Sequence, residues 1–264
     1  MANKSASFIW YELMTTDATA AARFYGTVVG WKIAERADPA ATGQDYRTIV
    51  RSDGGSAGGV LQLTQEMCEH GARSTWMGYL HVDDVDAALK AIEADGGRPL
   101  MPKRALPVGE IAMVADPAGA PIYVMHPIPP ADNPDSVSDV FDTAALQRVR
   151  WNELASSDLA RAKGFYVKHF GFELKESMPM GELGEYCFID QGGRRIGAMM
   201  QKADANPTSG WLFYFGVPSI SAARRAVEAG GGKILNDVHQ VPGGEWIFVA
   251  QDPQGAPFGV VGTE

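Results

Sequence analysis

Two glutamates at matching places in the sequence are the strongest candidates for chemistry. Glu12 and Glu153 each follow a tryptophan, Trp10 or Trp151, by two residues. If these segments form β-strands, alternate side chains share a face, so each carboxylate lies beside an indole ring. Aromatic neighbours that exclude water raise the pKa of a carboxylate toward neutrality, which suits a general base. General-base catalysis by Glu12 or Glu153 is therefore one hypothesis for this chain.

The alternative hypothesis gives both carboxylates a structural role. Each could accept hydrogen bonds from the neighbouring backbone or pair with a cation such as Arg150. Their repetition does not decide between the two hypotheses, because a residue that preserves the fold is retained after duplication as readily as a catalytic one. Only the surroundings of each carboxylate can separate them.

The two glutamates belong to an internal repeat of the sequence. Residues 10–33 recur 141 positions later, and eight positions of this 24-residue window are identical. An internal repeat fixes the architecture, because each copy must form the same structural unit. The matching pairs are Trp10/Trp151, Glu12/Glu153, Leu13/Leu154, Asp17/Asp158, Ala21/Ala162, Phe24/Phe165, Tyr25/Tyr166 and Gly30/Gly171.

Each half of the sequence contains two copies of one βαβββ pattern. Aspartates at the helix starts can cap free backbone N–H groups, and glycines end the helices. The first half has predicted strands at 8–14, 31–36, 45–50 and 58–64 around a helix after Asp17, then strands at 75–82, 98–101, 110–115 and 121–126 around a helix after Asp84. Trp76 and Tyr79 return as Trp211 and Tyr214 in the second half.

The pattern predicts two tandem domains of α+β class. The first domain covers residues 1–126 and the second covers residues 148–264, with two βαβββ modules in each. Residues 127–147 between them are rich in proline and polar residues, which predicts a linker without a helix.

Composition excludes several classes of partner. The chain of 264 residues has a formal charge of −9 and no apolar run long enough to span a membrane. Nucleic acids and anionic membranes both reward clustered lysine and arginine, so neither is expected as a partner. Two cysteines without a paired spacing predict reduced thiols. We expect a cytoplasmic monomer or homodimer with a small-molecule ligand.

Taken together, these motifs resemble the vicinal oxygen chelate superfamily. That family includes glyoxalase I, bleomycin-resistance proteins, fosfomycin-resistance enzymes and extradiol dioxygenases. The likeness rests on the four βαβββ patterns, the Asp-capped helix that carries Phe24 and Tyr25, and the closing turns at 116–121 and 252–257. It covers nearly the whole chain outside the linker. The motif Trp-x-Glu-Leu…Asp…Phe-Tyr is most similar to that of two-domain glyoxalase-like proteins of bacteria.

The resemblance implies a curved mixed sheet around a cleft in each domain, with helices outside. It also implies which strand faces line the clefts. Besides the two glutamates, the residues expected there are Trp10, Met14, Gln62, Met77, Tyr79, His81, Tyr123, Trp151, Met200, Leu212 and Tyr214.

Metal enzymes of the family hold a divalent cation with four ligands, usually histidine, glutamate or glutamine. The resemblance places these positions at Trp10, Gln62, Met77 and Tyr123 in the first half, and at Trp151, Met200 (or Gln201 if the register shifts by one), Leu212 and Gly259 in the second. An indole N–H only donates and a thioether is a soft ligand, so neither suits a hard cation. We therefore predict no metal cofactor, although Glu12, Gln62 and His81 could form a displaced site.

Three functions follow from these observations. The preferred one is metal-independent binding of a small molecule, for which an aromatic ligand suits the aromatic cleft positions. The second is a metal-dependent lyase, isomerase or dioxygenase of the glyoxalase type, which would need Zn, Ni, Fe or Mn. The third is a metal-free enzyme that uses Glu12 or Glu153 as its general base. Fold alone does not choose among them.

Overall fold

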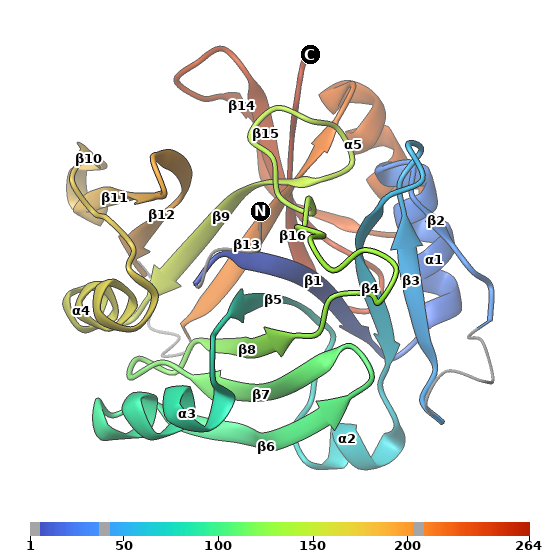
Figure 1. The fold of residues 1–264 in the computed structure, drawn as a ribbon. Coiled ribbons are helices and arrows are strands. Elements are labelled where there is room, and N and C mark those ends of the chain that lie inside the picture. The colour runs from blue at the N-terminus through green and yellow to red at the C-terminus, as the bar shows by residue number, and fades with distance from the viewer. Residues whose placement is uncertain (1–5, 37–42, 203–208) are drawn as a thin grey trace. The chain divides into compact units, whose positions relative to one another are not determined.

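The chain forms two compact units, and each unit takes segments from both halves of the sequence. The computed structural model describes residues 6–36, 43–202 and 209–264 (Figure 1). Unit 1 contains Met1–Ile9, Met77–Ser138 and Trp151–Trp211, and unit 2 contains Trp10–Trp76, Asp139–Arg150 and Leu212–Glu264.

Unit 2 combines the first and the last βαβββ modules of the chain. Their helices α1 and α5 pack side by side (Figure 1). Module 1 consists of β1 (Phe8–Thr15), α1 (Ala18–Val28), β2 (Lys32–Ile33), β3 (Tyr46–Val50) and β4 (Ser56–Gln62), followed by α2 (Gln65–Glu69). Module 4 consists of β13 (Gly210–Val217), α5 (Ile220–Ala229), β14 (Lys233–Gln240), β15 (Trp246–Gln251) and β16 (Pro257–Gly262).

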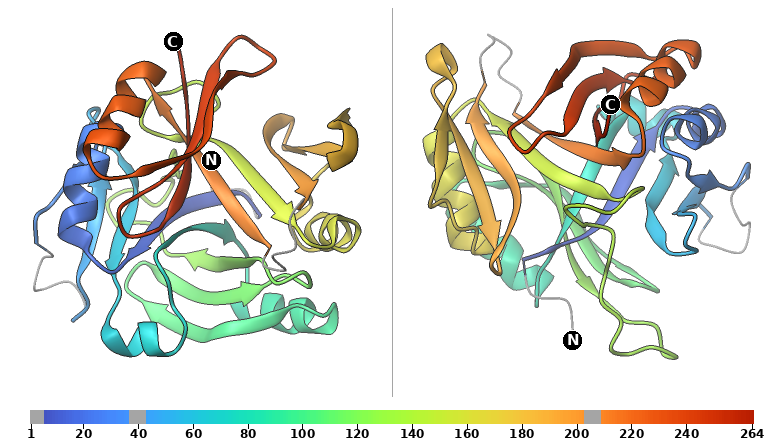
Figure 2. Two further views of the ribbon diagram at one scale, coloured as in Figure 1. Left: turned by 180° about the vertical axis from the view of Figure 1, so that it is seen from behind. Right: turned by 90° about the horizontal axis from the view of Figure 1, so that it is seen from above.

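Unit 1 combines the two middle modules, whose helices α3 and α4 are in contact (Figure 2). The first two residues of β1, β5, β9 and β13 fall in the other unit. Module 2 consists of β5 (Thr75–His81), α3 (Val85–Ala94), β6 (Arg98–Leu106), β7 (Gly109–Ala115) and β8 (Pro121–Pro127). Module 3 consists of β9 (Val149–Ser156), α4 (Leu159–Phe170), β10 (Ser177–Pro179), η1 (Gly181–Leu183), β11 (Glu185–Gln191) and β12 (Arg194–Gln201).

All four modules share one strand arrangement. The strand orders are β2-β3-β4-β1, β5-β8-β7-β6, β10-β11-β12-β9 and β13-β16-β15-β14. In each module the first and last strands pair in parallel, and the other pairs are antiparallel. The predicted α+β class with four βαβββ modules is confirmed.

The helix starts follow the capping residues that the sequence predicts. Oδ1 of Asp17 accepts a hydrogen bond from the backbone N–H of Ala20 at 2.9 Å, and Asp84 caps α3 in the same way. The sequence did not predict α2, where Thr64 is the cap and the preceding strand ends two residues earlier than expected. In the described part of the chain, no helix has both the length and the apolar composition that crossing a membrane requires.

A buried tyrosine joins the elements of each unit. In unit 2 the hydroxyl of Tyr25 donates to Oδ2 of Asp252 at 3.1 Å and accepts from Nε1 of Trp76 at 2.9 Å. In unit 1 Tyr166 accepts from Nε1 of Trp211 at 3.0 Å and bonds to Asp116. Both tryptophans are buried in the core, and their N–H groups are satisfied there.

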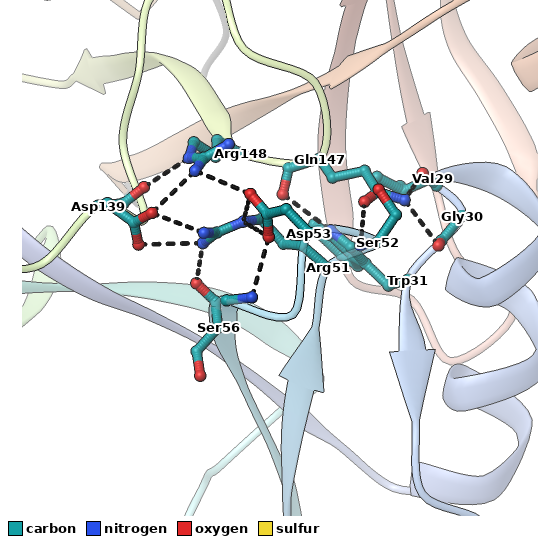
Figure 3. A network of polar contacts seen from close by, with 11 residues as sticks. Val29, Gly30, Trp31, Arg51, Ser52, Asp53, Ser56, Asp139, Gln147 and Arg148 are labelled. Atoms are coloured by element: carbon teal, nitrogen blue, oxygen red, sulfur yellow. Dashed lines mark hydrogen bonds and ion pairs between the residues drawn. The ribbon is translucent and has the colours of Figure 1, made fainter.

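The end of the predicted linker is bound to module 1 by charged side chains (Figure 3). Arg51, only 2% exposed, donates to Asp139 at 2.6 and 3.1 Å and to Asp53 at 3.1 Å. Arg148 donates to the same two aspartates at 2.8 and 3.1 Å. Gln147 donates to the carbonyl oxygen of Gly30 at 2.7 Å, which adds a second attachment to module 1.

Candidate functional site

The first strand of module 3 presents a half-buried face that carries two of the predicted site residues. Along β9, Trp151, Glu153 and Ala155 are half-buried, whereas the side chains between them are buried. This alternation follows from the pleat of a strand, which sends successive side chains to opposite faces. The carboxylate of Glu153 and the indole of Trp151 therefore share the partly exposed face, as the sequence predicts.

Tyr186 connects the tryptophan to the glutamate. Nε1 of Trp151 donates a hydrogen bond to the hydroxyl oxygen of Tyr186 at 2.8 Å, and that hydroxyl donates to Oε2 of Glu153 at 2.6 Å. Burial and the negative charge of Glu153 raise the pKa of Tyr186 far above its usual value. The phenol therefore remains protonated and remains a donor to the carboxylate.

Further side chains extend this face across β11 and β12. The ring of Phe188 lies 5.7 Å from that of Tyr186 and 6.3 Å from that of Trp151, in edge-on geometry. Met200 lies opposite Tyr186 in the β11–β12 pair and opposite Ala155 in the β12–β9 pair, which places it on the same face. We call Trp151, Glu153, Tyr186, Phe188 and Met200 the open face of module 3.

A cation rests on the edge of the open face. The guanidinium of Arg195 lies 4.3 Å from the centre of the Phe188 ring. Arg195 also donates to Asp190 at 3.0 Å and to Glu176 at 2.8 Å. Its charge is therefore balanced by carboxylates while its flat group covers one aromatic ring.

Module 1 contains a similar tryptophan–tyrosine pair, with a more deeply buried glutamate. Nε1 of Trp10 donates to the hydroxyl of Tyr46 at 2.7 Å, as in module 3. Glu12, however, is only 3% exposed. Its neighbour in β4 is Gly59, where an added Cβ would stand 2.1 Å from the hydroxyl of Tyr46. The ring of Tyr46 therefore packs directly against Gly59. In module 3 the residue opposite Glu153 is Ala198, and its methyl group occupies the equivalent space.

Gln62 lies on a different strand face from the one that the sequence analysis assigned to it. It pairs with Thr15, so it is on the face opposite Trp10 and Glu12, and Leu61 takes the expected position beside Met14. Oε1 of Gln62 accepts from the backbone N–H of Ala18 at 2.8 Å, which satisfies a free donor at the start of α1. This register removes Gln62 from the displaced metal site suggested with Glu12 and His81.

In module 2 the predicted residues form an aromatic stack. Tyr79 and Tyr123 face each other in the β5–β8 pair, with ring centres 4.2 Å apart and planes 17° apart. Met77 and His81 lie on the same strand as Tyr79 and are also buried. Nε2 of His81 lies 3.9 Å from Asp83.

In module 4 a tyrosine covers the last predicted position. Tyr214 pairs with Gly259, and an added Cβ at that glycine would stand 2.3 Å from the Tyr214 ring. Leu212, two residues earlier on β13, is half-buried. Aromatic rings therefore occupy the space around the predicted final positions of both module 2 and module 4.

A comparison with protein families agrees with this architecture. The model of the Glyoxalase/Bleomycin resistance protein/Dioxygenase superfamily matches residues 7–124 and 146–260. The chain belongs to this superfamily.

Members with similar sequences carry different names. The chain is 27% identical over 253 residues to CFP32 of Mycobacterium bovis, provisionally named a glyoxylase, and the match covers 96% of this chain and 93% of CFP32. It is 29% identical over 268 residues to the anthracycline biosynthesis protein DauV of Streptomyces sp. strain C5, with 96% and 91% covered.

A solved structure of the superfamily shows the same fold. The Mn(II)-bound glyoxalase from Novosphingobium aromaticivorans has a TM-score of 0.64 to this chain at 15% identity, and the match covers 98% of this chain and 82% of that chain. At this identity the likeness concerns the fold alone.

At the positions where the resemblance places metal ligands, the residues of this chain do not suit a hard divalent cation. The first-strand positions are indoles whose N–H groups donate to tyrosines, and the remaining positions are Leu61, Met77, Tyr123, Met200, Leu212 and Gly259. Hard divalent cations prefer carboxylate, carbonyl and imidazole ligands, and this set has no carboxylate or imidazole. Among the residues that the structure describes, no group of three or more His, Cys, Asp or Glu side chains could hold a metal ion.

Tyr46 and Tyr186, which bond to the two tryptophans, were not predicted as site residues. Each follows an acidic residue, Asp45 or Glu185, and the two tyrosines are 140 positions apart rather than 141. A comparison at one fixed offset does not align them, because the loop before the third strand is one residue shorter in module 3. An alignment that allowed one gap would have paired them.

Proposed function

We propose that this member of the glyoxalase superfamily binds a small aromatic molecule on the open face of module 3, without a metal ion. The observation that carries the proposal is the combination on one half-buried face of three aromatic rings and a carboxylate, held together by the bonds between Trp151, Tyr186 and Glu153. Stacking on such rings is favourable for flat ligands. The hydrogen bonds hold the tyrosine ring and the carboxylate in position before a ligand arrives.

The names of relatives support an aromatic ligand. The Streptomyces relatives are named for the biosynthesis of anthracyclines, and a polycyclic aromatic molecule of that kind is the class that this face fits. The chemistry of the family's metal-ligand positions supports the metal-independent part of the proposal, because indole and thioether groups occupy them.

Binding of acridine, a flat neutral probe, to protein dialysed against EDTA tests the proposal. We expect saturable binding, followed by acridine fluorescence, that Zn²⁺ or Mn²⁺ does not strengthen. Trp151→Ala should weaken it about tenfold, since stacking on an aromatic side chain contributes roughly 1–3 kcal/mol. The matched variant Trp10→Ala in module 1 should change the affinity less than about twofold.

Two results would contradict the proposal. Binding that appears only after a divalent metal is added would favour a metal-dependent lyase, isomerase or dioxygenase. Equal losses in the Trp151 and Trp10 variants would show that the open face is not the site. If a bound compound found by native mass spectrometry is converted by the protein, and Glu153→Gln abolishes conversion but not binding, the general-base alternative replaces simple binding.

A further inference from the structure

We propose that a cavity beside helix α4 in unit 1 is a further ligand site, which binds the phosphate group of a small phosphate ester. The cavity has a volume of about 330 Å³ and lies between α4, the end of α3 and the turn that follows β7. Its walls include Asp95, Pro117, Arg161, Gly164, Phe165 and Lys168, which all belong to unit 1. The residues that line it are not those of the open face of module 3, so this site is separate from that of the proposed function.

Arg161 supplies the main donors of the cavity. Its guanidinium lies against Gly96 at the end of α3, where an added Cβ would meet Nη2 of Arg161. The C-terminal end of a helix attracts a cation, which keeps the guanidinium beside the cavity. Within the part of the chain that the structure describes, this guanidinium makes no hydrogen bond and no ion pair. Its planar N–H groups can therefore bind two oxygens of one phosphate.

Lys168 adds a second positive charge to the cavity. Nζ of Lys168 donates to Oδ1 of Asp95 at 2.6 Å, and Nε2 of His169 lies 2.6 Å from Oδ2 of Asp95. Bonds from these two residues lower the pKa of Asp95, so its carboxylate is ionised. Among the described residues that line the cavity, this one carboxylate stands against two cations. A phosphate group, with about −1.5 to −2 charges at neutral pH, is attracted to both cations.

Gly164 leaves open the space that a ligand needs. It lies inside α4 with a helical backbone, and a Cβ added there would meet nothing within 4 Å. Neither backbone conformation nor crowding therefore requires glycine at this position, although glycine destabilises a helix relative to alanine. Because Gly164 lines the cavity, a side chain in its place would project into it. A ligand that approaches the helix at this point explains the glycine.

The equivalent helix of unit 2 shows that the fold does not demand this arrangement. In α1, 141 positions earlier, the counterparts of Arg161, Gly164 and Lys168 are Ala20, Arg23 and Thr27. An uncharged residue stands in place of each cation, and a long side chain stands in place of the glycine. Two cations on either side of a glycine are therefore a feature of the cavity in unit 1 and not of the repeated module.

The rest of the cavity wall favours an ester over free phosphate. Pro117, Ala160 and Phe165 have apolar side chains and lie beside the two cations in the wall. Cavities of roughly 300 Å³ and more accommodate small organic ligands. The carbon atoms of an ester can contact these side chains while its phosphate is bound by Arg161 and Lys168.

Three probes that differ in one group each test the proposal by titration calorimetry at fixed ionic strength. Monobutyl phosphate has both groups, inorganic phosphate lacks the alkyl chain, and pentanoate carries a carboxylate in place of the phosphate. We expect saturable binding of monobutyl phosphate, about threefold tighter than inorganic phosphate and at least about tenfold tighter than pentanoate. Equal affinity for pentanoate, or no saturable binding of monobutyl phosphate, would overturn the proposal. Equal affinity for inorganic phosphate would overturn the assignment to an ester.

Three variants locate the bound phosphate. Arg161→Gln should weaken the binding of monobutyl phosphate at least about tenfold, as expected for the loss of a charged donor. Gly164→Met fills the cavity and should weaken it as much, while the urea midpoint of unfolding stays the same or rises, since methionine favours a helix over glycine. Lys163→Gln is the matched control, because it removes a charge from α4 outside the cavity. It should change the affinity less than about twofold.

The variants also define the results that contradict the site. Equal losses in Arg161→Gln and Lys163→Gln would show that binding follows the general charge of α4 and not the cavity. Unchanged affinity in Gly164→Met would show that the ligand does not occupy the space above the glycine. Either result would overturn the proposal.

Discussion

The hydroxyl of Tyr186 donates a 2.6 Å hydrogen bond to Oε2 of Glu153 across an intervening strand. Tyr186 lies on β11 and Glu153 on β9, and β12 runs between them. In module 1 Tyr46 on β3 reaches across β4 to Trp10 on β1 in the same way. In modules 1 and 3, side chains thus connect the third strand to the first, in addition to the backbone ladder.

Replacing Tyr186 by phenylalanine tests this connection. The variant leaves the indole N–H of Trp151 without its acceptor and the carboxylate of Glu153 without its donor. We expect a loss of about 1–3 kcal/mol in the free energy of unfolding, because partly buried polar groups lose their partners. Urea denaturation measures it. A loss below about 0.5 kcal/mol would contradict a stabilising role for the two hydrogen bonds of Tyr186.

Gln62 offers a test that distinguishes a structural side chain from a metal ligand. Its amide accepts from the N–H of Ala18 and donates to the carbonyl oxygen of Thr16, both at 2.8 Å. Gln201 makes the equivalent bonds at the start of α4. We expect Gln62→Ala and Gln201→Ala each to lower the free energy of unfolding by about 1–2 kcal/mol, as the loss of a helix cap does. Measured zinc or manganese affinity should not change, and a loss of metal binding in either variant would show that this assignment is wrong.

The sequence predicts local features of this fold better than contacts between strands. Asp17 and Asp84 cap their helices as expected, because capping depends on residues within one turn. The face of Gln62 was assigned from a distant resemblance, and a shift of one residue in register moves a side chain to the other face of a strand. The pairing of Gln62 with Thr15 is set by the β1–β4 ladder, which no local signal reports.

In the candidate site, too, some residues can be predicted from the sequence and others cannot. Trp151 and Glu153 could be found because an exact repeat marks them and strand alternation puts them on one face. Tyr186 could not be found at the fixed offset, because a loop shortened by one residue hides its match with Tyr46. The different exposure of Glu12 and Glu153 depends on packing around each module, and nothing in two matching segments predicts it.

Arg51 should contribute strongly to the attachment of residues 139–150 to module 1 within unit 2. It is buried, and it bonds to Asp139, to Asp53 and to the carbonyl oxygen of Ser56 (Figure 3). We expect Arg51→Met to cost about 2–3 kcal/mol, less than for a fully buried pair because both aspartates remain in contact with water. Limited proteolysis should then cut within residues 139–150 much faster than in the wild type.

Arg195 is the matched control for this variant. It also bonds to two carboxylates, but it is 35% exposed. Arg195→Met should therefore cost less than about 1 kcal/mol, as for most exposed ion pairs. Equal losses in the two variants, or an unchanged cleavage rate in Arg51→Met, would show that burial of Arg51 does not strengthen the attachment.

The buried carboxyl group of Asp252 should make unit 2 less stable as pH rises. Burial raises its pKa above the usual 3.8, although bonds from Ala256, Tyr25 and Gln254 oppose the increase. The folded chain therefore keeps this proton at pH values where the unfolded chain has released it. The contribution of Asp252 to stability is complete below the unfolded pKa and is lost as pH rises through the folded pKa. Asp252→Asn does not titrate, so its stability relative to the wild type should increase from about pH 4 upward.

Asp53 should show the opposite dependence and serves as the control. Hydrogen bonds from the backbone N–H of Gly55 and from Arg51 lower its pKa below 3.8. Its contribution is present above the unfolded pKa and is lost as pH falls through the folded pKa, so Asp53→Asn should lose stability relative to the wild type as pH rises. Urea denaturation of the three proteins across this range measures both differences. Slopes of the same sign for the two variants would refute the assignment, because burial and hydrogen bonding shift these two carboxyl groups in opposite directions.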